Sequence, residues 1–202
     1  MKNSWIIGID EVGRGSIAGP VTVGALIAPT NTKYKIPNSK LKLRDSKKLS
    51  PSQREQWFEY IKNHPKIHFA VAHIQPSVVD RINISQAANR AASKALGKLL
   101  KNNELRIKNK ARIYLDGGLY IRDKLQTTNY QLQTVVRGDE KIKAISLASI
   151  VAKVTRDRLM VRTHKKYPRY GFAIHKGYGT KAHMRAVKRF GPSEKHRLTF
   201  LT

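Results

Sequence analysis

The sequence has 202 residues, 40% of them hydrophobic and 26% charged, so the chain can bury a substantial core and is expected to be globular rather than disordered. Its 40 Lys and Arg against 13 Asp and Glu give a formal net charge of +27, which predicts a polyanionic partner such as nucleic acid; a surface charged only for solubility is the alternative. The chain has no cysteine, no signal-peptide pattern and no apolar run of transmembrane length, which excludes disulfides and thiolate zinc sites, predicts no membrane partner and favours a cytoplasmic location.

Stretches rich in β-branched and apolar residues, separated by Gly, Pro and polar residues, predict strands. The predicted strands are residues 5–9, 21–28, 67–74, 111–116 and 130–136. Apolar residues at helical spacing predict helices at residues 85–101, 143–167 and 181–190. A further helix is predicted to begin after Ser50, because Ser50 can cap it, Pro51 suits its first position and Gln53 completes a capping box.

This order of strands and helices is typical of an α/β fold, a mixed sheet flanked by helices. Pro168 is expected to end the long helix, and the residues after it predict loops around one short helix. No internal repeat or low-complexity linker divides the chain. We therefore expect a single domain over residues 1–202, with a core of about residues 1–167 and a C-terminal helical and loop appendage of about residues 168–202.

Four carboxylates stand where they could converge. Asp10 and Glu11 follow the first predicted strand, Asp116 ends a later strand, and Asp157 lies on the long helix. If they meet, their negative charges repel one another unless cations neutralise them. Oxygen-rich clusters of this kind bind Mg²⁺ or Mn²⁺, and two such ions can activate a water and stabilise the leaving oxygen of a phosphodiester. In so basic a chain, this pattern predicts a metal-dependent nuclease.

Each carboxylate also has an ordinary structural interpretation. The Asp-Glu pair and Asp116 both precede glycines, as carboxylates in solvated turns do. Asp157 follows Lys153 by one helical turn, a spacing typical of ion pairs on a helix surface. These carboxylates follow apolar strands or lie on a partly apolar helix face. This joint placement favours the nuclease interpretation over the ordinary structural interpretation of each residue.

Two other kinds of site fit the sequence less well. Residues 13–18, GRGSIA, match the glycine pattern of dinucleotide-binding loops, but Pro20 and the β-branched run after it predict a strand where that motif needs a helix. Histidine-based ribonuclease chemistry has seven candidate residues, yet none stands in a pattern with Ser or Asp that suggests a triad. For His175, His183 and His196, phosphate contact or loop packing is the favoured role.

A series of motifs runs through almost the whole chain, from about residue 6 to about residue 200. They are GIDEVGRGSIAGPV, RDSKKLS, YLDGG, VRGDE, SLASIVAKVTRDRLM, YPRYGFAIHKGYGTKAH and FGPSEKHR. Together they resemble bacterial type 2 ribonuclease H, the ribonuclease HII family. The resemblance implies a ribonuclease H-like fold and an endonuclease that cuts the RNA strand of RNA/DNA hybrids. It also implies nicking of duplex DNA on the 5′ side of an embedded ribonucleotide, with 5′-phosphate and 3′-hydroxyl ends.

The same resemblance implies roles for individual residues. It assigns catalysis and the metal site to Asp10, Glu11, Asp116 and Asp157. Gly13, Arg14 and Gly15 would grip the sugar-phosphate at the RNA-to-DNA junction and sense the 2′-hydroxyl, which glycines permit by close backbone approach. Tyr178 would stack on the following deoxyribose, and Lys47 resembles a phosphate-contacting position near the metals.

The chain departs from the family pattern at a few positions. Ser16 and Ile17 stand where Pro-Leu is common, and Arg137 stands where a lysine is usual, which leaves the loop geometry and the salt optimum open. The expected partners are RNA/DNA hybrid and ribonucleotide-containing duplex DNA. The sequence shows no tail that supports docking to a sliding clamp, and a monomer is expected.

Two rival functions remain at the level of sequence. A non-catalytic basic binder, resembling a ribosomal protein, explains the charge but gives no reason for carboxylates at strand ends. Another nuclease of the same fold, such as a junction resolvase, explains the carboxylates, but Gly13 to Gly15 and Tyr178 argue against it.

Overall fold

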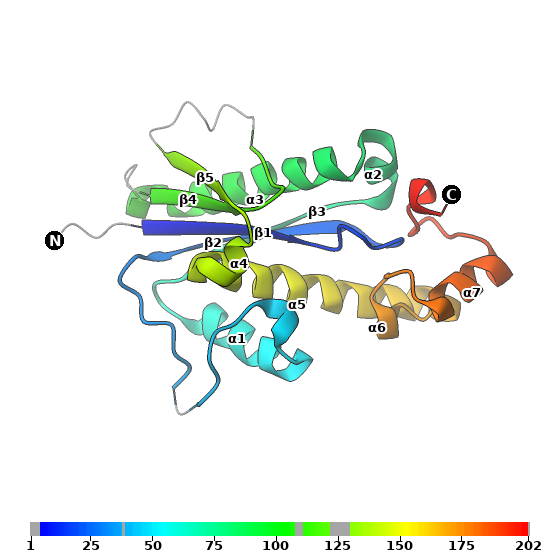
Figure 1. Cartoon of the computed structure of the whole chain (residues 1–202), viewed down its shortest axis with the longest axis horizontal. Helices are drawn as coiled ribbons and strands as arrows, with labels where there is room; N and C mark the ends of the chain where they lie inside the picture. Colours follow the sequence, from blue (N-terminus) through cyan, green and yellow to red (C-terminus); the bar gives the residue numbers. More distant parts are fainter. Residues whose placement is uncertain (1–4, 38, 108–110, 122–129, 202) are drawn as a thin grey trace.

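The structure is a computed structural model that describes residues 5–37, 39–107, 111–121 and 130–201 (Figure 1). Its strands are β1 (Trp5–Val12), β2 (Val21–Pro29), β3 (His68–Ile74), β4 (Ala111–Asp116) and β5 (Gln131–Val135). Its α-helices are α1 (Pro51–Asn63), α2 (Pro76–Ile82), α3 (Ile84–Ile107), α4 (Gly138–Lys141), α5 (Lys143–Lys166), α6 (Phe172–His175) and α7 (Lys181–Phe190). Short 3₁₀ helices are η1 (Ser46–Lys48), η3 (Pro168–Tyr170) and η4 (Leu198–Phe200).

The strands form one mixed sheet in the order β3-β2-β1-β4-β5. β1, β2 and β3 pair antiparallel, whereas β4 pairs parallel with both β1 and β5. The parallel pairing places the C-terminal ends of β1 and β4 at the same edge of the sheet. The predicted fold class, a ribonuclease H-like mixed sheet flanked by helices, is confirmed.

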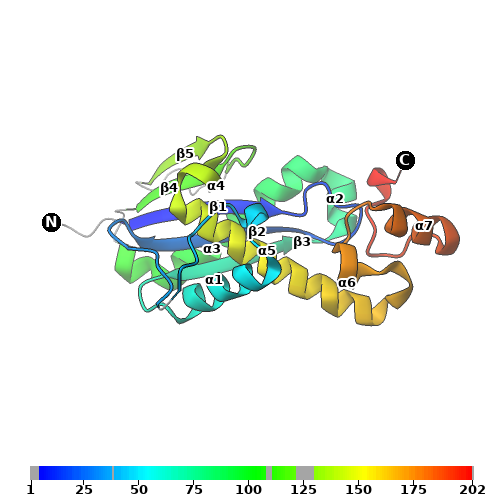
Figure 2. The same ribbon diagram turned by 60° about the horizontal axis from the view of Figure 1, so that its bottom comes forward.

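Helices cover both faces of the sheet. α2 and α3 lie on one face, and α5 lies on the other, with α1 packed beside it and against β3 through Phe58 and Phe69 (Figures 1 and 2). One buried cluster is centred on the alanines and leucines of α3, and a second is centred on Trp57 of α1 and the apolar face of α5. The capping box predicted at Ser50, Pro51 and Gln53 starts α1.

α5 approaches the sheet unusually closely because two glycines lie beneath it. A Cβ on Gly8 of β1 would lie 2.2 Å from the backbone carbon of Ala144, and a Cβ on Gly24 of β2 would lie 2.6 Å from the Ala148 oxygen. Only glycine permits this contact between backbones. α5 is thereby fixed against β2 and against β1, which carries Asp10 and Glu11.

Several predicted boundaries shift in the structure. β1 continues to Val12, so Asp10 and Glu11 lie inside the strand, paired with Gly24 and Val23 of β2, instead of following its end. α3 extends beyond the predicted 85–101, and α2 and α6 were not predicted. The predicted helices at 143–167 and 181–190 are confirmed, with α5 ending one residue early at Lys166, and Pro168 follows its end as predicted.

The C-terminal elements lie together at one end of the molecule (Figures 1 and 2). η3, α6 and α7 contribute to a small buried cluster in which Tyr170 and Phe172 pack with Met160 of α5 and Ala18. The division into a core and an appendage stays a prediction, and residues 1–4 and 202 lie outside the described residues.

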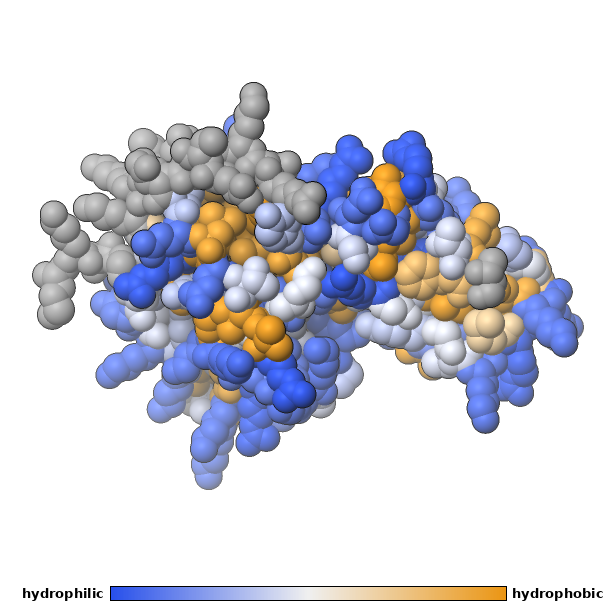
Figure 3. All heavy atoms as spheres, turned by 45° about the horizontal axis from the view of Figure 1, so that its top comes forward, coloured by the Kyte–Doolittle hydropathy of each residue, from blue (hydrophilic) through white to orange (hydrophobic). Residues whose placement is uncertain are grey.

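The surface in Figure 3 is mostly hydrophilic, with apolar side chains in separate small groups. Within the described ranges, none of the helices combines the length and apolar character needed to cross a bilayer.

Candidate functional site

Three of the four predicted metal ligands meet at the shared edge of β1 and β4. Oxygen atoms of Asp10, Glu11 and Asp116 all lie within 4.8 Å of one another. The register explains this, because Ile9 pairs with Leu115 and the next residues along the two parallel strands are Asp10 and Asp116. These three carboxylates therefore converge, as the predicted metal site requires.

Local hydrogen bonds orient two of these carboxylates. Asp116 Oδ1 accepts from the Gly138 amide at 2.7 Å, and Arg137, in a left-handed conformation with φ of 53°, turns the chain into α4 at this point. Asp10 Oδ1 accepts from the Glu11 amide at 2.8 Å and the Asp10 side chain also interacts with the Ser149 hydroxyl of α5. The carboxylates are thus held by the backbone and by α5.

The site favours bound cations electrostatically. Burial, followed by the charges of Glu11 and Asp116, raises the pKa of Asp10 well above its ordinary value, although the hydrogen bond from Ser149 opposes the shift. Burial also raises the pKa of Glu11, more than the Arg14 guanidinium lowers it. Glu11 Oε2 is buried and has no hydrogen-bond partner within the described part of the chain. An orphaned carboxylate oxygen beside two other carboxylates fits a hard divalent cation.

Asp157 does not belong to this compact group. Its Oδ1 lies 2.8 Å from Lys153 Nζ, one turn earlier on α5, as the alternative ion-pair interpretation anticipated. Lys153 Nζ also lies 5.7 Å from the Tyr178 ring centroid, so Asp157 lies on the part of α5 near the segment that carries Tyr178. A metal-binding role for Asp157 stays a prediction.

Lys47 lies within the electrostatic field of the cluster. Burial lowers its pKa, but the carboxylates of Asp139, Asp45, Asp10 and Asp116 outweigh this and raise it. Lys47 Nζ is 3.7 Å from Asp139 Oδ2 while its side chain remains largely exposed. An exposed cation beside the acidic cluster is available to a phosphate.

The loop of residues 13–20, called here the 13–20 loop, leaves β1 directly after the cluster. Gly13 has φ of 83°, which favours glycine, and nothing lies within 4 Å of a Cβ built on Gly15. The amides of Arg14 and Gly15 have no hydrogen-bond acceptor among the described residues. Arg14 spans from Glu11 Oε1 at 3.3 Å to Ser85 Oγ of α3 at 2.9 Å. Open space and free amides leave this loop able to bind an anion.

Tyr178 lies beside the 13–20 loop. It forms a β-bridge with Ser16, and the Ala18 amide donates to the Gly177 oxygen at 3.1 Å. Lys153 Nζ and the Arg156 guanidinium each lie 5.7 Å from the Tyr178 ring centroid. The ring is partly exposed and therefore available for stacking. The structure brings together the two segments that the sequence associated only by resemblance.

The histidines at the C-terminal end pack in the interior. The rings of His175 and His183 stack at 4.1 Å, and His183 Nε2 lies 3.1 Å from His196 Nε2. Burial, together with the electrostatic effect of His175 and His196, lowers the pKa of His183 to about 4. Of the two predicted roles, loop packing describes these residues.

Some residues at the site were missed from the sequence. Ser149 and Ser46, whose hydroxyls are 2.7 Å apart, connect Asp10 to η1. Arg156 and Arg197 are fully buried against the 13–20 loop. Arg156, Arg197 and both serines occur within the quoted motifs, but motif membership alone gave no role for them.

Comparison with known proteins identifies the family. The family model for ribonuclease HII matches residues 7–202. A ribonuclease HII from Bacillus mycoides is 44% identical over 98% of this chain and 69% of its own length, and one from Coxiella burnetii is 43% identical over 98% and 89%. The structure is similar to that of ribonuclease HII in the PCNA:RNase HII complex of Archaeoglobus fulgidus, with a TM-score of 0.68, 25% identity, and 96% and 93% of the two chains covered. The chain therefore belongs to the ribonuclease HII family and is a nuclease of the ribonuclease H type.

Proposed function

We propose that the chain is a metal-dependent endoribonuclease that cuts the RNA strand of RNA/DNA hybrids and nicks duplex DNA on the 5′ side of an embedded ribonucleotide, leaving 5′-phosphate and 3′-hydroxyl ends. The observation that carries this proposal is the group of Asp10, Glu11 and Asp116 directly beside a glycine loop with two free amides. A cation site and an anion site are thus only a few residues apart in the chain.

Asp10, Glu11 and Asp116 would hold Mg²⁺ or Mn²⁺, with Asp157 completing a two-ion site. The all-oxygen donor set and the orphaned Glu11 Oε2 support this assignment. When bound, two such ions supply an activated water and stabilise the leaving oxygen. Lys47 would orient the phosphate next to the cluster, and Arg14 would do so from the opposite side, between Glu11 and α3.

Recognition of the ribonucleotide would rest on the 13–20 loop and Tyr178. The 2′-hydroxyl is the feature that distinguishes a ribonucleotide within DNA, and the free amides of Arg14 and Gly15 can donate to a sugar or phosphate oxygen. Tyr178 would lie against the next sugar, where a missing hydroxyl allows close contact. Sequence-independent contacts to the backbone come from the basic surface.

A nicking assay tests the proposal. A duplex DNA with one ribonucleotide should be cut once on its 5′ side with Mg²⁺ or Mn²⁺ present, and the product should carry a 5′-phosphate. Excess chelator should stop the reaction. A 2′,3′-cyclic phosphate product, or full activity in chelator, would refute the proposal.

Tyr178→Ala is expected to weaken junction discrimination. Loss of a stacked ring removes on the order of 1 to 3 kcal/mol, so the ratio of kcat/KM on the junction substrate to that on a uniform hybrid should fall roughly 5- to 150-fold. Tyr178→Phe is the matched control, because it keeps the ring and should keep the ratio. Equal losses on both substrates would argue against stacking at the junction.

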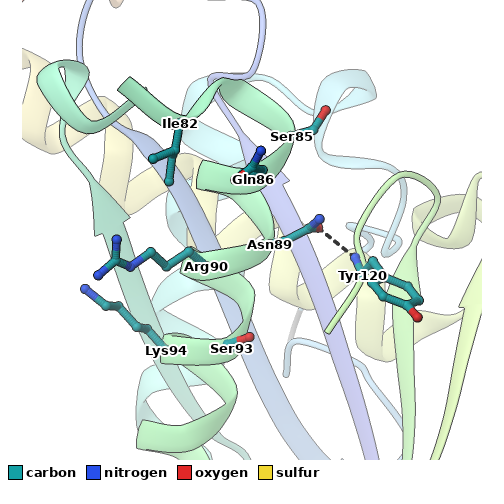
Figure 4. Close-up of a pocket in the computed structure, with 8 residues that line it drawn as sticks. All are labelled: Ile82, Ser85, Gln86, Asn89, Arg90, Ser93, Lys94 and Tyr120. Carbon is teal, nitrogen blue, oxygen red and sulfur yellow. Dashed lines mark hydrogen bonds between the residues drawn. The ribbon is translucent and has the colours of Figure 1, made fainter. Parts of the chain in front are cut away.

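A groove of about 1150 Å³ continues from Arg14 along α3 (Figure 4). It is lined by Ile82, Ser85, Gln86, Asn89, Arg90, Ser93, Lys94 and Tyr120. Arg90 and Lys94 extend side by side, and Asn89 accepts a hydrogen bond from the Tyr120 amide at 2.8 Å. None of these eight described residues carries a carboxylate. From Ser85 to Lys94 the helix rises about 13 Å, roughly four nucleotides at about 3.4 Å each, so the groove suits a nucleic-acid backbone leading away from Arg14.

Arg90→Gln combined with Lys94→Gln is expected to weaken duplex binding and its salt dependence. If each cation contacts one phosphate, the slope of log K against log salt should become shallower by about 2. Lys35→Gln with Lys66→Gln is the control, because both lysines are exposed and lie beside elements on the other face of the sheet. Equal changes of slope in the two double variants would assign the effect to net charge rather than to the groove.

A further inference from the structure

Two buried arginines hold the 13–20 loop from beneath. The side chains of Arg156, on α5, and Arg197, near the C-terminus, have no solvent exposure. Neither forms an ion pair with a carboxylate in the part of the chain that the structure describes. Burying an unpaired charge is strongly unfavourable, so these residues need another set of partners.

Backbone carbonyls supply those partners. Arg197 donates to the oxygens of Gly13 at 2.7 Å, Arg14 at 2.9 Å and Gly19 at 3.0 Å. Arg156 donates to the oxygens of Ala18 at 3.0 Å, Pro20 at 3.0 Å and Lys176 at 2.8 Å. The two guanidinium groups therefore bind the loop at both ends and also bind the segment that carries Tyr178.

The direction of these bonds matters for the loop. The carbonyls of Gly13 and Arg14 accept from Arg197. Each of these carbonyls shares a planar peptide unit with the next amide, that of Arg14 or Gly15, and these two amides have no acceptor among the described residues. A larger residue at position 13 would clash here, since a Cβ built on Gly13 would lie 2.2 Å from Arg156 Nε. Fixing the carbonyls thus fixes the free amides.

Arg156 also connects the loop to the rest of the site. It directly precedes Asp157 on α5, its guanidinium lies 5.7 Å from the Tyr178 ring centroid, and its bond to Lys176 holds the turn before Tyr178. Burial, followed by the charge of Arg156, lowers the pKa of Arg197 to about 10, so the Arg197 guanidinium remains charged near neutral pH. A planar fork of donors, which lysine lacks, is required to reach several carbonyls at once.

We propose that Arg156 and Arg197 are positioning residues that set the 13–20 loop and Tyr178 relative to the carboxylate cluster, and thereby determine how fast a ribonucleotide in duplex DNA is cleaved. The part concerning cleavage rests on the proposed function. The part concerning loop position does not, because it depends only on the six bonds to carbonyls.

The main test compares Arg197→Lys with a stability-matched control. Ile61→Val or Ile61→Ala, buried in α1 away from the loop, is chosen to lower Tm by the same amount. Arg197→Lys should reduce kcat/KM on the ribonucleotide duplex by about 100-fold, as misplacement by about 1 Å can do, mainly through kcat, and should raise deuterium uptake of peptides covering residues 13–20. The control should change neither. Equal loss of activity in the control, or unchanged uptake in Arg197→Lys, would overturn the proposal.

A second measurement uses the unsubstituted protein and does not depend on a folded variant. In ¹⁵N NMR with chelator present, addition of a ribonucleotide-containing duplex should shift the Arg14 and Gly15 amide signals. The Nε signals of Arg156 and Arg197 should stay slow to exchange with solvent before and after addition. Freely exchanging guanidinium signals would overturn the positioning role. If the unsubstituted protein fails to nick the duplex while uptake and guanidinium protection behave as expected, the proposed function fails and the loop inference stands.

Discussion

Asp10→Asn is expected to reduce cleavage of a ribonucleotide-containing duplex by more than about 100-fold, since losing residues that merely orient metal ligands already costs 10- to 100-fold. Asp10 lies within 4.8 Å of Glu11 and Asp116, and the charges of both raise its pKa. Asparagine has the same shape but no charge, so it weakens cation binding without emptying the space. Duplex binding, measured in chelator, should be retained because the basic surface is unchanged.

Thermal unfolding separates this loss from loss of the fold. In chelator, removal of one of three mutually repelling carboxylates should leave Tm unchanged or raise it. Glu55→Gln is the control for charge, because Glu55 is a partly exposed residue of α1 whose ion-pair partner within the described residues is Arg158; its turnover should equal that of the unsubstituted enzyme. Normal turnover in Asp10→Asn would remove Asp10 from the catalytic site.

The sheet and the longer helices follow from local signals in the sequence. β-branched runs, the Ser50 capping box and Pro168 act over a few residues, so the strand positions, the start of α1 and the end of α5 agree with the structure. The predicted end of β1 was wrong because the prediction assumed that the strand ends where charged residues begin. Here the ladder to Gly24 and Val23 of β2 continues through Asp10 and Glu11, and tertiary pairing outweighs local preference.

The carboxylate cluster could be predicted because its chemistry depends on side-chain type and on strand ends. The register between β1 and β4 then brings Asp10 beside Asp116. The supporting residues could not be predicted in the same way. Arg156 and Arg197 bind backbone oxygens. Because every residue has a backbone oxygen, no pattern of side chains in the sequence indicates these contacts. For Asp157 the side-chain pattern fits two interpretations, a metal ligand and an ion pair with Lys153 one helical turn earlier.

Gly8→Ala is expected to destabilise the protein by about 3 kcal/mol or more. The new Cβ would lie 2.2 Å from the carbon, 2.3 Å from the oxygen of Ala144 and 2.4 Å from the nitrogen of Ile145. These are backbone atoms, so no side-chain rotation relieves the clash, and α5 must move away from the sheet. Overpacking costs about 1 to 3 kcal/mol even where side chains can adjust. Because total stability is about 5 to 15 kcal/mol, this change should lower Tm and soluble yield markedly.

Gly97→Ala provides the opposite result from the same chemical change. Gly97 lies within α3, has a helical backbone and has nothing within 4 Å of the added Cβ, so alanine should stabilise the helix by about 0.5 to 1 kcal/mol and raise Tm by about 1 to 4 °C. Thermal unfolding of both variants measures the difference. α5 also carries Ser149, Arg156 and Asp157, so a displaced α5 should reduce cleavage in any Gly8→Ala protein that folds, whereas Gly97→Ala should cleave normally. A Gly8→Ala protein as stable as Gly97→Ala would mean that α5 does not lie against β1 at backbone contact, and the support for Asp10 from Ser149 would be lost with it.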